Sequence, residues 1–205
     1  IELFAKKHID GHAPGIRGKE VQAYRLAGVE NDHECSTAEE VLDKLRAGLH
    51  IYVREGSGAK NLETLIKTML DAGVCLDRCA FCTDDKHVEE IRKEGHISTC
   101  IRKAIALGVP VAKAYKMGSY QAAEFYGLKN YGAIGAGYRA DIVFLDDLEQ
   151  VRPLDVMKDG RILTEEDYAK DYPVPVPDEL LHTVHVGEVT KEKIRLSCDG
   201  KTDVK

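Results

Sequence analysis

The chain has 205 residues, of which 43% are hydrophobic, and its 29 basic and 35 acidic residues give a formal net charge of −6. No apolar run is long enough to span a bilayer, so the composition predicts a soluble globular protein and excludes a membrane-spanning one. Charges of both signs are spread along the chain, which argues against a nucleic-acid partner and favours a small-molecule or protein partner. Six cysteines at irregular spacings, with no signal peptide, indicate free thiols and a cytoplasmic location.

The first part of the chain alternates strand-like runs with helical patterns. Strands are predicted at residues 7–10, 29–32, 50–54 and 78–82. Helices are predicted at residues 19–27, 37–47, 62–70, 87–107 and 110–126. Thr37 and Glu40 have the spacing of a capping box, and the helix after them is expected to place Val41 inside and Lys44 outside. Four βα units in series predict an α/β fold and half of a (β/α)8 barrel, since a complete barrel needs about 250 residues.

The pattern changes in the last part of the chain. Residues 132–137 are turn-forming, residues 140–145 have the composition of a buried strand, and residues 156–163 predict a hairpin around Asp159 and Gly160. Three prolines that alternate with valines then predict an extended linker. The predicted parts are half of a barrel at 1–129, a small β module at 130–172, and a linker with the start of a further domain at 173–205.

Side chains that can bind a metal ion follow three of the predicted strands. His12 comes after the first strand, His33 after the second and Asp84 after the fourth. In a β/α barrel the carboxyl ends of the strands meet at one rim, so two imidazoles and a carboxylate placed there can converge on one ion. The alternative role for His12 and His33 is that of a hydrogen-bonded residue in a turn. The alternative role for Asp84 is to cap the helix that follows it.

Five short motifs occur in a distinctive order and spacing. They are Gly-His-Ala-Pro-Gly at 11–15, Asp-His-Glu-Cys at 32–35, Val-Arg-Glu-Gly-Ser at 53–57, Cys-Thr-Asp-Asp at 82–85, and Gly-Ala-Ile followed by Ala-Asp-Ile-Val within 132–143. Together they resemble the adenine deaminase family of the amidohydrolase superfamily. The resemblance implies the C-terminal half of a TIM-type (β/α)8 barrel, followed by a small β-sandwich segment. His12, His33, Arg54 and Asp84 would then mark the ends of barrel strands five to eight.

The resemblance also implies elements that the chain lacks. A pair of histidines after the first barrel strand and a metal-bridging carboxylate of the fourth strand would precede Ile1, which stands where a start methionine is expected. We therefore expect a chain that begins inside a longer protein, binds metal incompletely by itself and does not deaminate adenine alone. One motif departs from the family, because Lys86, His87 and Val88 stand where a basic residue, a histidine and a proline are usual.

The activity that the resemblance implies is the metal-dependent hydrolytic deamination of adenine to hypoxanthine and ammonia. His12, His33 and Asp84 would bind a divalent metal, which lowers the pKa of a water molecule. Asp84 would also act as general acid and base, and Glu34 would be a second catalytic residue near a ring nitrogen. The residues expected to contact the purine are Arg54, Glu55, Ser57 and Asp85. The alternative for these residues is a salt-bridged rim or, for Asp85, a helix cap.

The cofactor and the partners follow from the same resemblance. Imidazole and carboxylate ligands suit zinc, manganese and iron alike, and the resemblance favours manganese or iron, bound as a pair of ions in the longer protein. We expect a small-molecule purine substrate and neither a nucleic-acid nor a membrane partner. We also expect a homo-oligomer, or a chain that is completed by the N-terminal region of the barrel.

Three other functions stay open. One is an amidohydrolase that opens a cyclic amide, and another is a noncatalytic fragment completed by a second polypeptide. The third is a radical S-adenosylmethionine iron–sulfur protein, because Cys75, Cys79 and Cys82 have its ligand spacing; against it, the strand predicted at 78–82 directs its side chains into packing. The histidines expected to be ordinary hydrogen-bonded or surface residues are His8, His50, His96, His182 and His185.

We predict that Cys75, Cys79 and Cys82 bind no iron–sulfur cluster. The purified protein should show no visible absorption band and no acid-labile sulfide, because three cluster ligands need an irregular loop and a strand does not supply one. Absorption spectra and a sulfide assay measure this. Sulfide in an amount that matches iron, lost when any one of the three cysteines is substituted, would contradict the prediction.

Overall fold

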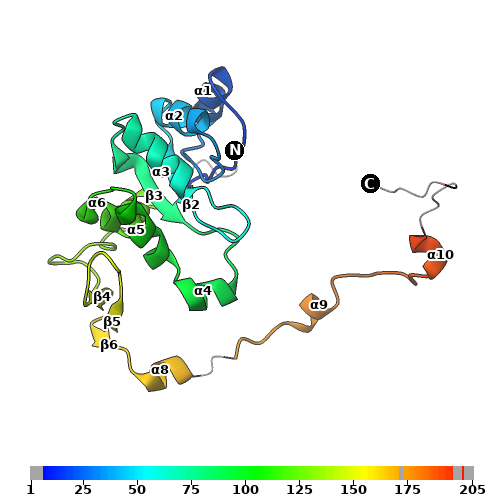
Figure 1. Ribbon diagram of the computed structural model, residues 1–205. Coiled ribbons are helices and arrows are strands. Elements are labelled where there is room, and N and C mark those ends of the chain that lie inside the picture. Colours follow the sequence, from blue (N-terminus) through cyan, green and yellow to red (C-terminus); the bar gives the residue numbers. More distant parts are fainter. Residues whose placement is uncertain (1–6, 171–172, 196–199, 201–205) are drawn as a thin grey trace. The chain divides into compact units, whose positions relative to one another are not determined.

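The computed structural model describes residues 7–170, 173–195 and 200 (Figure 1). Contacts divide the chain into two units, Ile1–Thr164 and Glu165–Lys205. Among the described residues, no helix has both the length and the apolar character needed to cross a bilayer. The three-part division that the sequence predicts, with boundaries after residues 129 and 172, stays a prediction.

A parallel sheet forms the centre of the first unit. Its strands are β1 (Asn31–Asp32), β2 (His50–Arg54) and β3 (Cys79–Cys82), in the order β1-β2-β3. The register places Asp32 opposite Ile51, and Arg54 opposite Cys82. The strand predicted at 50–54 is confirmed, whereas the strands at its two sides are shorter than predicted. In the part of the chain that the structure describes, this sheet stays open and does not close into a barrel.

Residues 7–10 form no strand, so that prediction is wrong. The segment after them is bound by side chains: the Gly11 amide donates to Asn31 Oδ1 at 2.8 Å, and the Ala13 amide to Asp32 Oδ1 at 2.8 Å. These bonds take the place of a backbone ladder, so the segment runs beside β1 as irregular chain. A Cβ atom on Gly11 would lie 1.9 Å from the Asn31 carbonyl oxygen, so only glycine permits this approach.

The first unit also contains helices. They are α1 (Lys19–Leu26), α2 (Ala38–Arg46), α3 (Leu62–Asp71), the 3₁₀ helix η2 (Leu76–Arg78), α4 (Val88–Glu94), α5 (Ile97–Ala106), α6 (Val111–Gly118) and α7 (Tyr120–Phe125). The predicted capping box is confirmed, because Thr37 Oγ1 accepts the Glu40 amide at 3.3 Å and Glu40 Oε2 accepts the Thr37 amide at 3.0 Å.

Two of the predicted helices are each divided in two. Gly95 has a φ of 94° and ends α4, and Ser119, with φ −143° and ψ −80°, separates α6 from α7. Neither conformation continues an α-helix, so the predictions of single helices at 87–107 and 110–126 are wrong in this respect.

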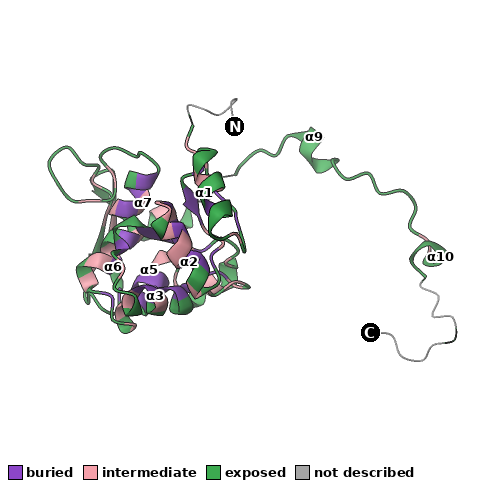
Figure 2. Cartoon of the chain, turned by 90° about the horizontal axis from the view of Figure 1, so that it is seen from above, coloured by how far each residue is buried: buried purple, intermediate pink, exposed green. Residues whose placement is uncertain are grey.

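Alternate residues of the parallel strands face two different clusters. Ile51, Val53 and Phe81 are buried in the main core, on the face that α2, α3, α5 and α6 contact. Tyr52 and Ala80 point to the opposite face, where they pack with residues of α7. This alternation follows from the two-residue period of a strand. Figure 2 shows α3 and α7 with buried residues on one side and exposed residues on the other.

An antiparallel sheet follows the helices. It contains β4 (Ile142–Leu145), β5 (Pro153–Lys158) and β6 (Arg161–Ile162). The predicted hairpin is confirmed: Asp159 and Gly160 have φ values of 51° and 78°, and a two-residue turn with two positive φ values matches the twist of a hairpin. The prediction that 140–145 is a buried strand is wrong. Val143 is 52% exposed and Phe144 is 40% exposed, because no layer of described residues covers that face.

The second unit contains short helices. They are α8 (Glu165–Ala169), α9 (Asp178–Leu181) and α10 (Lys191–Ile194), and none of them has a buried residue. Residues 173–177, which include the three alternating prolines, have no regular secondary structure.

Met69→Ala should lower the free energy of unfolding by about 2–5 kcal/mol. Met69 is 0% exposed, and its Sδ lies 3.6 Å from Cys79 Sγ of β3, so the shorter side chain leaves a cavity in the core. Urea unfolding followed by circular dichroism measures the change. Lys67→Ala, on the exposed side of the same helix, is the matched control and should cost about 0.5 kcal/mol or less. Equal stabilities of the two variants would contradict the prediction.

Candidate functional site

The side chains predicted to form the site lie at one edge of the parallel sheet. His33 and Glu34 follow β1, Arg54 is the last residue of β2, and Asp84 comes shortly after β3. Because parallel strands point in the same direction, their carboxyl ends share an edge. His12 reaches this edge from the irregular segment that runs beside β1.

Three of these side chains are arranged to share one metal ion. His12, His33 and Glu34 each offer a ligand atom, and the three atoms lie within 4.8 Å of one another. Glu34 Oε1 is 3.6 Å from His12 Nδ1 and 3.4 Å from His33 Nε2. The His12 side chain is 66% exposed and that of Glu34 only 13%, so the group opens to solvent on one side. Two imidazole nitrogens and a carboxylate oxygen fit a divalent transition metal.

Asp84 connects to this group through Arg54. The Arg54 guanidinium donates to both carboxylate oxygens of Glu34 and, at 3.0 Å, to Asp84 Oδ2. Burial works to lower the pKa of Arg54, but the bonds to Glu34 and Asp84 outweigh it and raise the pKa above its usual value. Arg54 is therefore a permanent cation whose single charge is shared between these two carboxylates.

The three candidate metal ligands in the structure differ in one residue from the three predicted from the sequence. A shared site for His12, His33 and Asp84 stays a prediction, while the structure brings Glu34 into the place beside the two imidazoles. The sequence analysis treated Glu34 as a catalytic residue and missed it as a ligand. The available signal was a carboxylate directly after His33, at the end of a strand.

The other predicted substrate-contact residues bond to neighbouring loops. Glu55 is 4% exposed and pairs with a lysine of α5 at 2.5 Å. Asp85 accepts the Gly58 amide at 2.7 Å, a bond that lowers the pKa of Asp85. Ser57 Oγ accepts the His87 amide at 2.9 Å. These contacts tie the loops after β2 and β3 together, as expected for a bonded rim, and substrate contacts by Glu55, Ser57 and Asp85 stay a prediction.

Glu40 of α2 holds the loop that carries His12. Its carboxylate accepts the amides of Gly15, Ser36 and Thr37. Burial works to raise the pKa of Glu40, but these hydrogen bonds outweigh it and lower the pKa to about 2. The charged carboxylate thus fixes the His12 loop to the beginning of α2.

A cavity of about 220 Å³ lies beside the candidate metal site. Its lining residues are Asp10, His33, Tyr52, Phe81, Cys82, Asp84, Ala122 and Tyr126. The rings of Tyr52 and Tyr126 stack with centroids 5.7 Å apart and an interplanar angle of 12°. An aromatic wall next to an imidazole and a carboxylate suits a flat heteroaromatic ligand.

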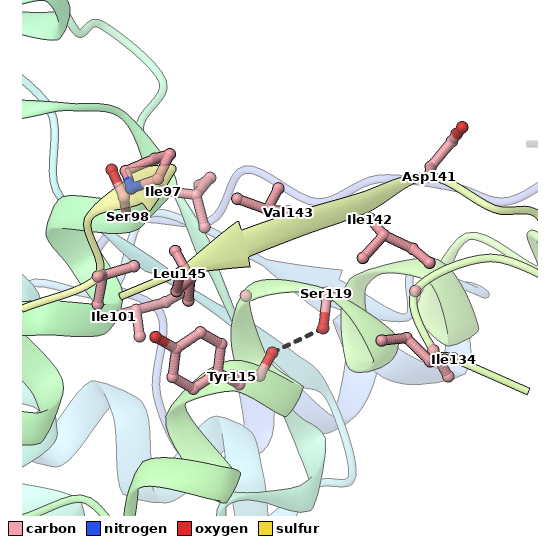
Figure 3. Close-up of a pocket in the computed structure, with 15 residues that line it drawn as sticks. Ile97, Ser98, Ile101, Tyr115, Ser119, Ile134, Asp141, Ile142, Val143 and Leu145 are labelled. Carbon is pink, nitrogen blue, oxygen red and sulfur yellow. Dashed lines mark hydrogen bonds between the residues drawn. The ribbon is translucent and has the colours of Figure 1, made fainter. Parts of the chain in front are cut away.

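A second cavity, of about 420 Å³, lies between helices α5 and α6 and strands β4 and β5 (Figure 3). Its walls are mostly apolar, with Ile101 and Leu145 among them, and none of the candidate metal ligands lines it. Figure 3 shows the carboxylate of Asp141 pointing away from the apolar side chains. This cavity is larger, but its polar lining offers a single carboxylate, Asp141, and no imidazole, so we place the candidate site at the strand ends.

Of the other histidines, His8 and His96 are hydrogen-bonded and His182 and His185 are exposed, as expected, whereas Nδ1 of His50 is buried without a hydrogen-bond partner among the described residues. His8 Nε2 lies 2.9 Å from Asn31 Nδ2, and His96 Nε2 lies 2.6 Å from Thr83 Oγ1. The ring of His50 packs on Phe125, with centroids 3.7 Å apart. In the described part of the chain, none of these histidines belongs to a group of three metal-ligating side chains.

The cysteines of the iron–sulfur alternative have different surroundings. Burial raises the pKa of the Cys79 thiol to about 12, and that of Cys82 to about 12. Cys75 is exposed and donates to Asp77 at 3.0 Å. Cys79 packs in the main core, whereas Cys82 packs against the cluster on the opposite face of the sheet, so the two thiols do not converge on one iron–sulfur cluster, which argues against this alternative.

Residues 2–163 match the model of the amidohydrolase family. The chain belongs to this family. An adenine deaminase of Clostridium acetobutylicum is 42% identical over 200 residues, which are 97% of this chain and 34% of the relative. An adenine deaminase of Desulfitobacterium hafniense is 40% identical over 197 residues, which are 96% of this chain and 34% of the relative. The resemblance is thereby confirmed, and the chain spans about a third of the length of these relatives.

Solved structures share the fold at lower identity. A β-aspartyl dipeptidase of Fervidobacterium islandicum has a TM-score of 0.58 and 19% identity, covering 80% of this chain and 48% of that chain. An amidohydrolase of Thermotoga maritima also has a TM-score of 0.58 and 19% identity, covering 80% of this chain and 45% of that chain. The likeness bears on the fold, and it identifies the first unit as part of a larger α/β domain.

Glu40→Gln should lower the free energy of unfolding at pH 7 by about 1–3 kcal/mol, because a neutral amide replaces a charged acceptor of three backbone amides. The pKa of Glu40 is about 2 in the folded chain and about 4.5 when unperturbed. Its contribution is therefore fully present above pH 4.5 and is lost as the pH falls toward 2.

Urea unfolding from pH 7 to pH 2.5 measures this dependence. The stability difference between the wild type and Glu40→Gln should be constant above about pH 5.5 and should shrink below about pH 4.5. Glu39→Gln, at the exposed neighbouring position, is the control and should show little difference at any pH. A difference that grows on acidification would refute the assignment.

Proposed function

We propose that the protein to which this chain belongs catalyses the hydrolytic deamination of adenine to hypoxanthine and ammonia. Adenine deaminase relatives with 42% and 40% identity support the proposal, as does the group of two imidazoles and a carboxylate at the strand ends. Because the chain spans 34% of those relatives, the activity is proposed for the whole protein. Residues 1–129 would form the C-terminal half of its (β/α)8 barrel, and residues 130–172 part of a small β-sandwich.

His12 and His33 hold a divalent metal in this proposal, together with the carboxylate of Glu34 or Asp84. Manganese or iron is the proposed ion, zinc also suits these ligands, and a second ion would need ligands from outside this chain. When bound, the metal lowers the pKa of a water molecule, so that hydroxide is available near neutral pH.

Asp84 is the proposed proton shuttle. Its carboxylate takes a proton from the attacking water and delivers protons to the ring nitrogen and to the departing amine. The water oxygen stays on the ring carbon, and the nitrogen leaves as ammonia. Arg54 Nη1, 3.0 Å from Asp84 Oδ2, holds this carboxylate at the strand end. Glu34 is the second proposed catalytic carboxylate, and the stacked rings of Tyr52 and Tyr126 offer a wall for the purine.

The partners and the location complete the proposal. The substrate is a free purine, contacted by residues of the rim around Arg54, and neither nucleic acid nor a membrane takes part. The protein acts in the cytoplasm as a homo-oligomer or with its barrel completed by the N-terminal region. The competing reaction within the family is the opening of a cyclic amide, which releases no ammonia from adenine.

Asp84→Asn should lower adenine turnover at least about 10²- to 10⁴-fold in a longer protein that includes the remaining barrel strands, because an amide cannot transfer protons. Ammonia release from adenine, with added manganese or iron, measures turnover, and circular dichroism checks the fold. Asp71→Asn, an exposed position at the end of α3, is the matched control and should keep full activity.

The 205-residue chain alone should release no ammonia from adenine, because an open sheet does not supply a complete metal coordination sphere. A ring-opening assay with a cyclic amide, run beside the ammonia assay with adenine, separates the competing reaction. Robust adenine turnover by the pure monomeric chain, or full activity of Asp84→Asn, would overturn the proposed assignment of roles.

A further inference from the structure

Lys44 is buried, although the helical pattern predicts it outside. Its side chain is 0% exposed, and buried lysines are rare unless they are paired. The Nζ atom donates to Asp32 Oδ2 at 2.9 Å and to the Ala13 carbonyl at 2.6 Å. The prediction is wrong because the irregular segment around Ala13 and the end of β1 close over this side of α2 and offer two acceptors.

The contacts of Lys44 form a closed ring with the loop of His12. Lys44 binds the carbonyl of Ala13, and the amide of the same residue donates to Asp32 Oδ1 at 2.8 Å. Both polar groups of the residue directly after His12 are therefore held by one buried ion pair. Hydrogen bonds to charged groups are shorter and stronger than neutral ones, so this ring restrains the backbone firmly.

Asp32 extends the same restraint to the second imidazole. Its Oδ2 accepts the Glu34 amide at 3.1 Å and the Cys35 thiol at 3.4 Å, just after His33. The carboxylate is 0% exposed, so its charge is tolerated only with a buried cation beside it. Lys44 supplies that cation.

We propose that Lys44 is a positioning residue that locks the His12 loop to the His33–Glu34 segment before a metal ion binds. The three ligand atoms come from two irregular segments, and the ring of Lys44, Asp32 and Ala13 links their backbones directly beside the ligands, in addition to the bonds of Glu40 and Asn31. That the group of His12, His33 and Glu34 binds a metal ion rests on the proposed function. That Lys44 and Asp32 connect the two segments rests on the observed contacts. Outer partners of this kind set metal affinity by fixing the orientation of the ligands.

The test compares Lys44→Met/Asp32→Asn with the wild type and with Lys67→Met, a matched lysine on the exposed side of α3. The double variant removes the charges of Lys44 and Asp32 together, so neither of these two groups is left without its partner. The Glu40 carboxylate, 4.0 Å from Lys44 Nζ, keeps its three backbone amide donors, and circular dichroism checks that the variant is folded. Amide hydrogen exchange reports the loop without any metal. Titration with Co²⁺, followed by its visible absorption, reports the ligand group, and His33→Ala identifies the signal of this site.

In the double variant, amides of residues 11–15 should exchange at least about 10-fold faster, while amides of β2 keep their protection. The dissociation constant for Co²⁺ should rise about 10- to 100-fold, with an altered absorption spectrum, and Lys67→Met should change neither. Unchanged loop exchange, or equal losses in the loop and in β2, would overturn the positioning role. If the wild-type chain binds no Co²⁺ but the loop amides of the double variant still exchange faster, the positioning role of Lys44 is supported and the proposed metal site is contradicted.

Discussion

The parallel alignment of β1, β2 and β3 is the constraint on which the site depends. The crossover helices α2 and α3 pack on one face of the sheet, and this burial keeps all three strands pointing the same way. Each fully buried side chain, such as Ile51 or Val53, contributes roughly 1.5–3 kcal/mol. Because this core fixes the strands, it also determines where His33, Arg54 and Asp84 lie at the sheet edge.

Charge at that edge connects the candidate metal ligands to Asp84. Arg54 is a permanent cation between Glu34 and Asp84, so its single positive charge offsets part of the negative charge of the two carboxylates. Glu34 faces both Arg54 and the two imidazoles, so a divalent ion placed at the imidazoles would compete with Arg54 for this carboxylate. The candidate ligand group and Asp84 are thus connected through one guanidinium.

The features that the sequence predicted correctly depend on neighbours close along the chain. The strand at 50–54, the capping box of Thr37 and Glu40, and the hairpin at Asp159 each follow from a few consecutive residues. The missed features depend on distant partners. Lys44 binds Ala13 across 31 positions, and no local periodicity contains that information. Glu34 is a candidate ligand because another segment brings an imidazole to it, which only the folded chain reveals.

Helix α2 explains how an irregular loop at a sheet edge acquires a fixed shape. Glu40 and Lys44 lie four positions apart, one helical turn, so both reach the same loop. Glu40 accepts the Gly15 amide and Lys44 donates to the Ala13 carbonyl, so the loop is held at two points by opposite charges. Each charge-assisted bond contributes roughly 1.5–3 kcal/mol, and displacing the loop breaks both. His12, with a side chain 66% exposed, is therefore positioned by this held backbone and by the edge-on contact of its ring with that of His33, whose centroids are 5.3 Å apart.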